Sequence, residues 1–413
     1  MMRLAPLGTP SRAWRFGLCA ALCWSALSCG GGGGSTGSFV GPTPTGSNVV
    51  GVVVDAGPTS TSPDVNTLFT TVTVCVPGST TNCQIIDHIQ VDTASYGLRI
   101  LAPVLTLSLP VQTTASGASL VECTQFVDGY SWGPVALADV QISGESAGSV
   151  PVQVIGDANF TNVPADCSSI GPAEDTVAAF GANGILGIGV FAQDCGSNCA
   201  NAAVPATYYA CTSTLCQATA VLLASQVQNP VTLFAKDNNG VVIQLPSVAA
   251  QGAATVAGFL IFGIDTQSNN KSGSQSVLTV DPNAGYFTTV FNTQSLTNSF
   301  LDTGSNALYF NDTGLTQCTG TNFAKFYCPV SPQGLSAVLQ GQNAVSVSVN
   351  FTVDNAETLG ANDPSLIAFA TLAGTYPTMD TFDWGLPFYY GRTVYTAVEN
   401  AATAVGTGPY VAF

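Results

Sequence analysis

The stretch 299–310, SFLDTGSNALYF, decides the fold. An apolar run ends on an acid, a turn of small residues follows, and a second apolar run begins. A chain built in this way presents one carboxylate at a rigid loop tip, although Asp-Thr-Gly by itself is also ordinary turn chemistry. The four residues of the turn are Asp302, Thr303, Gly304 and Ser305.

The same frame occurs 210 residues upstream, in the stretch 90–100, QVDTASYGLRI. Asp, Thr, a small residue and Ser recur in the same order, and a Leu lies six positions after each Asp. Two such loops would supply two carboxylates, and two carboxylates that face each other form a catalytic device. The residues of this upstream turn are Asp92, Thr93, Ala94 and Ser95.

A coarse internal repeat surrounds the two loops. Each Asp is followed, roughly 90 residues later, by an apolar element that contains Gly: GILGIG at 184–189 and WGLPF at 384–388. Glycine suits a strand that crosses closely beneath a loop. The matched order of loop and crossing strand therefore predicts two similar halves.

The composition favours an all-β fold. Of 413 residues, 46% are hydrophobic and only 8% are charged, and the chain is rich in Val and Thr, which prefer pleated surfaces. Short apolar runs broken by turn residues predict strands at 49–54, 68–76, 85–91, 98–101 and 135–142. Helical period is confined to short candidates at 202–209, 335–340 and 364–371.

The charge balance bears on the partners. The formal net charge is −16, and no cluster of Lys or Arg occurs along the chain. Proteins that bind nucleic acid or anionic membrane surfaces through electrostatics need a basic patch. The sequence therefore argues against both kinds of partner.

The first 28 residues predict a lipoprotein-type signal peptide. A basic start precedes the apolar run 16–27, which is too short for a stable membrane-spanning helix. Small residues precede Cys29, which would become the lipidated first residue; a plain secretory signal cut nearby is the alternative. Residues 29–48, rich in Gly and Ser, predict a flexible tether. We therefore expect an exported protein, anchored as a lipoprotein that faces the periplasm or the cell exterior.

Ten cysteines remain once Cys29 and the two within the signal peptide are set aside. An even count in an exported chain predicts disulfides. A zinc site is the minor alternative, but His88 is the only histidine and no paired CxxC spacing occurs. We expect no metal and no cofactor. Closeness in the sequence favours three pairs: Cys75 with Cys83, Cys211 with Cys216, and Cys318 with Cys328.

Taken in this order, the motifs resemble those of the pepsin-like aspartic peptidases over nearly all of residues 49–413. The wording around Asp92 is also similar to that of a group of uncharacterised bacterial exported proteins. The resemblance implies a bilobal fold, with an N-terminal β lobe at 49–228, a C-terminal β lobe at 229–413 and a cleft between them. Residues 126–144 resemble the flap hairpin and its following strand. The candidates for flap or substrate contact are Phe126, Tyr130 and Trp132.

The resemblance also implies roles at the two loops. Asp92 and Asp302 would share one proton, and a water activated between them would attack a peptide carbonyl. Ser95 and Ser305 would hydrogen-bond the outer carboxylate oxygens. The residues that would tie the loops together and complete the second turn are Thr93, Thr303 and Gly304.

These features predict an exported aspartic endopeptidase that binds a peptide or protein substrate as an extended strand. The family has Gly where this chain has Ala94, and the extra methyl would cost roughly 1 kcal/mol if the turn needs a positive φ. The segment 30–49 carries no Lys or Arg, so we expect no basic prosegment that plugs the cleft.

Three alternatives stay open. The first is a catalytically inactive binding module on the cell surface or in the periplasm, a reading that Ala94 and the altered flap favour. The second is a structural β-rich surface protein with coincidental Asp-Thr turns. The third is a different two-carboxylate enzyme such as a glycosidase, whose acids would lie about 5 Å or more apart.

Overall fold

The computed structural model describes residues 43–58, 64–320 and 323–413 of the chain. The predicted signal peptide, Cys29 and the tether up to residue 42 lie outside the described residues. Within the described ranges, none of the helices combines the length and the apolar character that crossing a membrane requires.

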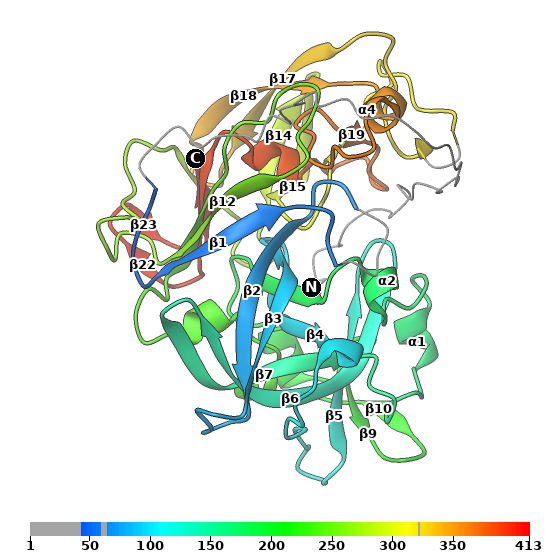
Figure 1. Cartoon of the computed structure of the whole chain (residues 1–413), viewed down its shortest axis with the longest axis vertical. Coiled ribbons are helices and arrows are strands. Elements are labelled where there is room, and N and C mark those ends of the chain that lie inside the picture. The colour runs from blue at the N-terminus through cyan, green and yellow to red at the C-terminus, as the bar shows by residue number, and fades with distance from the viewer. Residues whose placement is uncertain (1–42, 59–63, 321–322) are drawn as a thin grey trace, which may run out of the picture.

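The fold is all-β, as the composition predicted. Figure 1 shows the strands in two masses, with most of the first half of the chain below and most of the second half above. The strands of the first half are β1 (Val49–Val54), β2 (Leu68–Cys75), β3 (Cys83–Asp92), β4 (Tyr96–Leu101), β5 (Ser119–Gln125), β6 (Tyr130–Ile142), β7 (Glu145–Ile155), β8 (Gly184–Ile188), β9 (Tyr208–Cys211) and β10 (Cys216–Ala218).

The second half continues with shorter strands, and helices are few and short in both halves. The strands are β11 (Gly240–Gln244), β12 (Val256–Phe262), β13 (Val277–Thr279), β14 (Phe287–Phe291), β15 (Gln294–Leu301), β16 (Leu308–Tyr309), β17 (Gln333–Gln340), β18 (Ser346–Val353), β19 (Ala373–Gly374), β20 (Asp383–Trp384), β21 (Thr393–Ala397), β22 (Ala402–Thr403), β23 (Gly406–Thr407) and β24 (Tyr410–Ala412). The α-helices are α1 (Ala165–Ser168), α2 (Val177–Phe180), α3 (Ser197–Asn201) and α4 (Ala356–Asn362). The 3-10 helices are η1 (Ala102–Val104), η2 (Leu223–Ser225), η3 (Pro230–Leu233) and η5 (Leu386–Tyr389).

The three helix candidates of the sequence are wrong. Residues 335–340 belong to β17, which pairs with β14 on one side and β18 on the other. Residues 202–209 follow α3 and run into β9, and residues 364–371 form no helix. In β17, pairing on both edges outweighs a short helical period, because tertiary contacts override weak local propensity.

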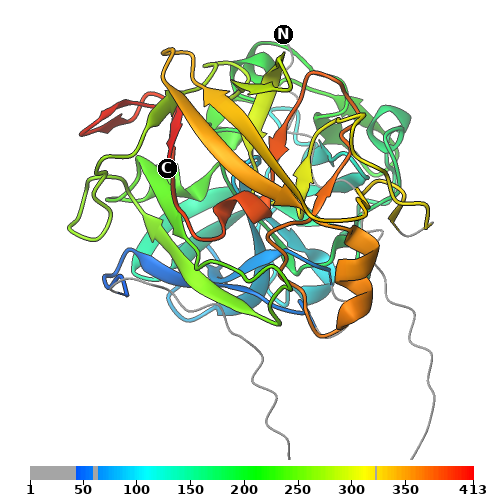
Figure 2. The same cartoon turned by 90° about the horizontal axis from the view of Figure 1, so that it is seen from above.

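Two sheets carry most of the strands. A fifteen-stranded sheet runs through both halves in the order β10-β9-β5-β6-β7-β4-β8-β3-β2-β1-β12-β11-β21-β24-β13, and an extra pairing of β2 with β6 closes six of its strands into a barrel. A seven-stranded sheet in the second half has the order β18-β17-β14-β15-β20-β16-β19. Figure 2 shows its β17–β18 hairpin lying across the top of the second half.

The predicted internal repeat appears in the strand pairing. In the first half, β8 lies between β3, to which it is parallel, and β4, to which it is antiparallel. In the second half, β20 lies in the same way between β15 and β16. Each Asp loop therefore connects two strands that flank one short crossing strand.

The glycines of the crossing strands stand where the sequence placed them. A Cβ atom at Gly187 would lie 2.6 Å from the carbonyl carbon of Ser95, and one at Gly385 would lie 2.6 Å from the carbonyl oxygen of Ser305. Real Cβ atoms do not approach so closely, so each crossing strand needs glycine beneath its loop. The matched glycines confirm the backbone approach predicted from the repeat.

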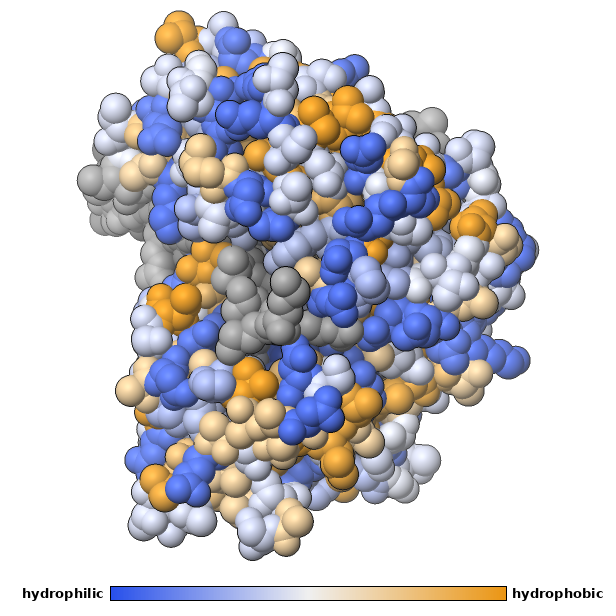
Figure 3. Space-filling view, turned by 180° about the vertical axis from the view of Figure 1, so that it is seen from behind, coloured by the Kyte–Doolittle hydropathy of each residue, from blue (hydrophilic) through white to orange (hydrophobic). Residues whose placement is uncertain are grey.

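An aromatic cluster supports the second loop from below. The ring of Phe382 stacks on Trp384 at 4.0 Å and on Phe310 at 4.6 Å between centroids. Phe351 packs edge-on against the first two of these rings. Aromatic pairs in these arrangements add stability beyond their buried area. Outside such clusters, the face in Figure 3 carries hydrophobic residues in small groups among hydrophilic ones.

All ten cysteines outside the predicted signal region are paired. The three predicted disulfides, Cys75–Cys83, Cys211–Cys216 and Cys318–Cys328, are confirmed. The remaining pairs, which the sequence left unassigned, are Cys123–Cys167 and Cys195–Cys199. Five disulfides indicate an extracellular or otherwise oxidising environment.

Candidate active site

The two acids of the repeated loops occupy equivalent positions. Asp92 is the last residue of β3 and is 4% exposed; Asp302 follows β15 and is 1% exposed. Each carboxylate accepts a hydrogen bond from the backbone N–H two residues later, at 2.7 Å from Ala94 to Asp92 and at 2.7 Å from Gly304 to Asp302. The two turns thus fix their acids in the same way.

The structure brings the two carboxyls into direct contact. An oxygen of Asp92 and an oxygen of Asp302 both lie 2.9 Å from the point where a Cβ of Gly304 would stand. Burial, the charges of Asp92 and Asp383 and a hydrogen bond to the Asp92 carboxyl together raise the pKa of Asp302 well above its ordinary value. Two acids so placed hold one proton between them over a range of pH.

The two threonines hold the loops against each other. The backbone N–H of Thr93 donates to Oγ1 of Thr303 at 3.2 Å, and the N–H of Thr303 donates to Oγ1 of Thr93 at 3.1 Å. Each hydroxyl in turn donates across to the opposite strand, to the carbonyls of Leu301 and Val91. These reciprocal contacts are those that the resemblance implied.

Tyr389 is a supporting residue that the sequence reasoning missed. Its fully buried hydroxyl lies 2.9 Å from Oγ1 of Thr93. Since Thr93 uses its one proton on Leu301, Tyr389 donates to it. In the sequence, Tyr389 lies in an apolar run and is therefore expected to be a core residue. No local pattern indicates that its hydroxyl contacts Thr93, 296 residues away.

The serines of the two loops differ, which corrects the prediction for Ser95. Oγ of Ser305 lies 2.8 Å from Oδ2 of Asp302, as expected, and 2.6 Å from Oδ2 of Asp383. Oγ of Ser95 is buried and has no hydrogen-bond partner among the described residues. Asp383 stands two residues before Gly385, which follows β20; the equivalent residue of β8, two before Gly187, is the apolar Ile185. The first loop therefore lacks the second acidic group that contacts Ser305.

Ala94 fits its turn without backbone strain. Its φ is not positive, nor is that of Gly304 at the equivalent position. The cost considered for a left-handed alanine therefore does not arise. The side chain of Ala94 is 7% exposed and packs in an apolar cluster that includes Phe300. The departure from Gly leaves the first carboxylate held by the same N–H as the second.

Gly304 is the position where a methyl group should do harm. A Cβ there would stand 2.8 Å from Cγ of Asp92. We expect Gly304→Ala to push the carboxyls apart and to lower any reaction that depends on their contact by about 100-fold, the typical effect of a misplacement near 1 Å. Ala94→Gly, the matched change in the other loop, should leave the rate within a few-fold. Equal rates in the two variants would contradict this asymmetry.

The hairpin of β5 and β6 places its aromatic candidates in different surroundings. Phe126 is buried in a core cluster and packs edge-on against Phe180. Trp132 is buried against Tyr209, and its indole N–H donates to the carbonyl of Phe160 at 2.7 Å. Both side chains therefore serve the packing of the hairpin.

The remaining candidate and the turn of the hairpin lie nearer the surface. Tyr130, the first residue of β6, is partly exposed and lines a pocket in the first half of the chain. The hairpin turn contains Asp128, which interacts with the second half. The pKa of Tyr309 is raised by burial first, then by the charge of Asp383, and then by that of Asp128. Asp128 thus lies close enough to Tyr309 of the second half to interact with it electrostatically.

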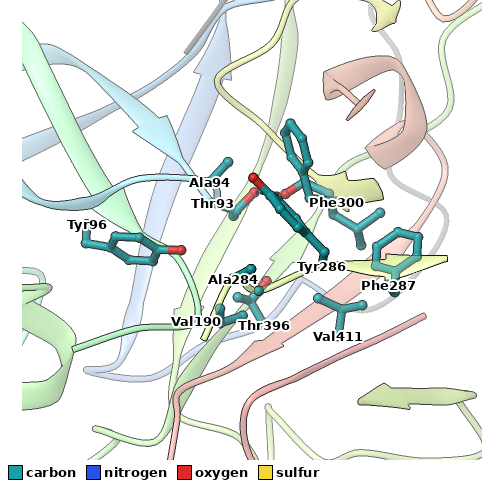
Figure 4. Close-up of a pocket in the computed structure, with 12 residues that line it drawn as sticks. Thr93, Ala94, Tyr96, Val190, Ala284, Tyr286, Phe287, Phe300, Thr396 and Val411 are labelled. Carbon is teal, nitrogen blue, oxygen red and sulfur yellow. Dashed lines mark hydrogen bonds between the residues drawn. The ribbon is translucent and has the colours of Figure 1, made fainter. Parts of the chain in front are cut away.

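A pocket lies beside the first loop, between the two halves. Figure 4 shows Tyr96 on one side of it, Tyr286 and Phe300 on the opposite side, and Thr93 and Ala94 between them. Apart from Thr93 and Thr396, its lining side chains are apolar or aromatic. The pocket thus places an apolar surface beside the first loop, while neither Asp92 nor Asp302 lines it.

A cluster of buried charged residues inside the first half was not predicted from the sequence. Arg99, 2% exposed, donates to Glu122 at 2.6 Å and to Asp194 at 3.2 Å. Burial and Glu122 raise the pKa of Asp194 well above its ordinary value, although Arg99 opposes this rise. Tyr208 donates to Asp194 at 2.7 Å. Since its acids are already engaged by Arg99, this cluster supports the fold of the first half rather than chemistry.

The described residues bring together one group with metal-ligand chemistry, Cys318, Cys328 and Glu357. The two cysteines form a disulfide, so their sulfur atoms are not thiolates. Thiolate is the form in which cysteine binds zinc. This group therefore offers no metal site.

Comparison with known proteins places the chain without naming an activity. No curated protein matches it. One family profile, described as "Protein of unknown function (DUF3443)", matches residues 44–413 and thus both Asp loops. The chain therefore belongs to the DUF3443 family.

Proposed function

We propose that the protein is an aspartic endopeptidase that hydrolyses peptide bonds with a water activated by Asp92 and Asp302. The observation that carries the proposal is the contact of two buried carboxyls, presented by equivalent loops and tied by reciprocal threonine hydrogen bonds. One shared proton gives the pair an ionised and a protonated member at the same time.

The chemistry follows from that shared proton. The ionised carboxyl takes a proton from a water held between the acids, and the protonated carboxyl donates to the oxygen of the peptide carbonyl. The water oxygen bonds to the carbonyl carbon and gives a tetrahedral gem-diol. Collapse of this intermediate breaks the C–N bond as the amine takes a proton. No covalent bond to the enzyme forms.

The surroundings of the acids support a peptide as the substrate. The residues Tyr96, Tyr286 and Phe300 give an apolar surface beside the first loop, against which an apolar part of a peptide could lie. The hairpin turn at Asp128 stands near the second half, where its backbone could pair with an extended chain. We infer that substrates bind as extended strands between this turn and the loops.

We also propose export and anchoring through Cys29. Five disulfides support an oxidising location. Mass spectrometry of the protein isolated from membranes checks the anchor, since a diacylated Cys29 at the mature N-terminus is expected. A mature protein that begins elsewhere and carries no lipid would refute the anchor without touching the proposed chemistry.

The proposed activity is tested with a mixed peptide library between pH 3 and 7 in water enriched in oxygen-18. We expect cleavage at internal bonds, with one heavy oxygen in each new carboxyl group and no acylated protein. Asp92→Asn serves as the matched blank. Absence of cleavage by the wild type at every pH would reject the peptidase and favour the inactive binding module.

A further inference from the structure

A third acid stands in the supporting layer of the site. Asp383 begins β20 and is fully buried. It pairs in register with Phe300 of β15 and Tyr309 of β16, directly beneath the second loop. The first half has Ile185 at the equivalent position, so the repeat does not require an acid there.

Counting protons at Ser305 shows that Asp383 cannot be a simple acceptor. Oγ of Ser305 lies 2.8 Å from an oxygen of Asp302 and 2.6 Å from an oxygen of Asp383. A serine hydroxyl has one proton and can donate it to only one of them. The other contact, at a distance typical of O–H···O bonds, needs a proton on the carboxyl. One of the two acids is therefore protonated toward Ser305.

The hydrogen-bond partners indicate which acid holds that proton. Asp302 accepts a second hydrogen bond, from the N–H of Gly304. Oδ1 of Asp383 is buried with no partner among the described residues. A buried carboxylate with one oxygen unsatisfied is costly, whereas the neutral acid loses much less. Asp383 is thus the member that stays protonated.

The charged and titratable groups around Asp383 point the same way. No salt bridge among the described residues includes it. Burial raises the pKa of Asp383 well above its ordinary value; the Ser305 hydrogen bond opposes this rise, and the charge of Asp92 adds to it. The groups that interact with it electrostatically are acids and phenols: Asp92, Asp302, Tyr309, Tyr376 and Tyr389.

We propose that Asp383 is a positioning residue that stays protonated and, by donating to Ser305, directs the serine hydroxyl onto the outer oxygen of Asp302. The relay runs from Asp383 through Ser305 to Asp302, and it keeps the shared proton of the dyad on the side that faces Asp92. The protonation of Asp383 stands on its own contacts; its effect on turnover rests on the proposed peptidase function.

Two substitutions separate the parts of this proposal. Asp383→Asn replaces the acid with a neutral amide whose NH2 group can donate to Ser305 in the same way. Asp383→Ile installs the residue that the first half uses at the equivalent position and removes the donor. The first variant imitates the protonated acid at every pH, and the second abolishes the relay.

The protonation is measured by carbon-13 NMR titration of the aspartate carboxyls. At pH 6 we expect two of the three acids of the site to be protonated in the wild type and one in each variant. Asp383→Asn keeps this test valid even if Asp383→Ile folds poorly. The same number of protonated carboxyls in the wild type and Asp383→Asn would overturn the assignment, whatever the protein's activity.

The positioning role is measured by the pH dependence of kcat on a cleaved peptide. We expect kcat of Asp383→Ile to be at least about tenfold below that of Asp383→Asn with similar KM, because only the amide keeps Ser305 in place. The alkaline limb should lie about one pH unit higher in Asp383→Asn than in the wild type, since the amide cannot ionise. Equal kcat in the two variants, or an alkaline limb of Asp383→Asn at the same pH as that of the wild type, would overturn this role. A wild type without cleavage would reject the peptidase and leave the NMR result to decide the protonation.

Discussion

Replacing Asp302 with asparagine is expected to lower kcat for peptide hydrolysis by about 10²–10⁴-fold, the usual contribution of general acid–base catalysis. The amide oxygen of asparagine can still accept the hydrogen bond of Gly304, and its NH2 group can donate to Oγ of Ser305, so the loop should keep its shape. The amide can neither release nor take a proton, so the pair can no longer act as general acid and general base. The contact between two acids becomes a contact between an acid and an amide.

The measurement is kcat and KM for one cleaved peptide, with thermal unfolding followed in parallel. Asp92→Asn should give a loss of the same order, because the proton is a property of the pair. Asp363→Asn is the matched control: it removes the same charge from an exposed turn and should leave kcat unchanged. Activity that survives in either dyad variant with an intact fold would disprove the shared-proton mechanism.

Replacing Arg99 with methionine is expected to cost about 3–5 kcal/mol in the free energy of unfolding at pH 7. The change leaves Glu122 and Asp194 buried without their cation. Burial and Glu122 already raise the pKa of Asp194, and without Arg99 that pKa rises further above its value in the unfolded chain. Stability is therefore lost as the pH rises above about 4, the unfolded pKa of these groups, and the loss should be smallest in acid.

Chemical denaturation at pH 4.5 and pH 7 measures this effect. Arg392→Met is the matched control, because Arg392 lies over the ring of Phe388 at 4.5 Å and donates to a backbone carbonyl. No salt bridge among the described residues includes it, so its loss strands no carboxylate and should cost about 1 kcal/mol. An Arg99→Met protein as stable as this control at pH 7 would contradict the account of the ion cluster.

The strand content and the pair of Asp loops could be predicted from the sequence because both depend on local patterns. Alternating Val and Thr predict strands from neighbours alone, and Asp-Thr-small-Ser is complete within four residues. The positions of Gly187 and Gly385 could be predicted from the sequence as well, because each lies at a similar distance after its Asp loop. Close Cys residues likewise indicated three disulfides, whereas Cys123–Cys167 depends on how two distant segments fold together.

The missed features depend on contacts across the chain. Arg99, Glu122 and Asp194 come from three separate segments, and only the folded first half makes them neighbours. The sequence gives only a weak signal for Asp383: it is the one acid in the otherwise apolar run FDWGLPF at 382–388. A buried acid in such a run has to meet another polar group. The prediction for Ser95 failed because the two loops were assumed to be symmetric, while their supporting strands carry Ile185 and Asp383.

The pairing of β1 with β12 has a consequence for the order of events during synthesis. A ribosome delivers β1 first, yet its partner begins about two hundred residues later, and β24 must still close the sheet through β21. The loop of Asp92 therefore emerges long before Thr303 and Leu301 exist to hold it. Neither loop can share a proton by itself. The activity proposed above would therefore be absent from a nascent chain until the second loop has been made and docked.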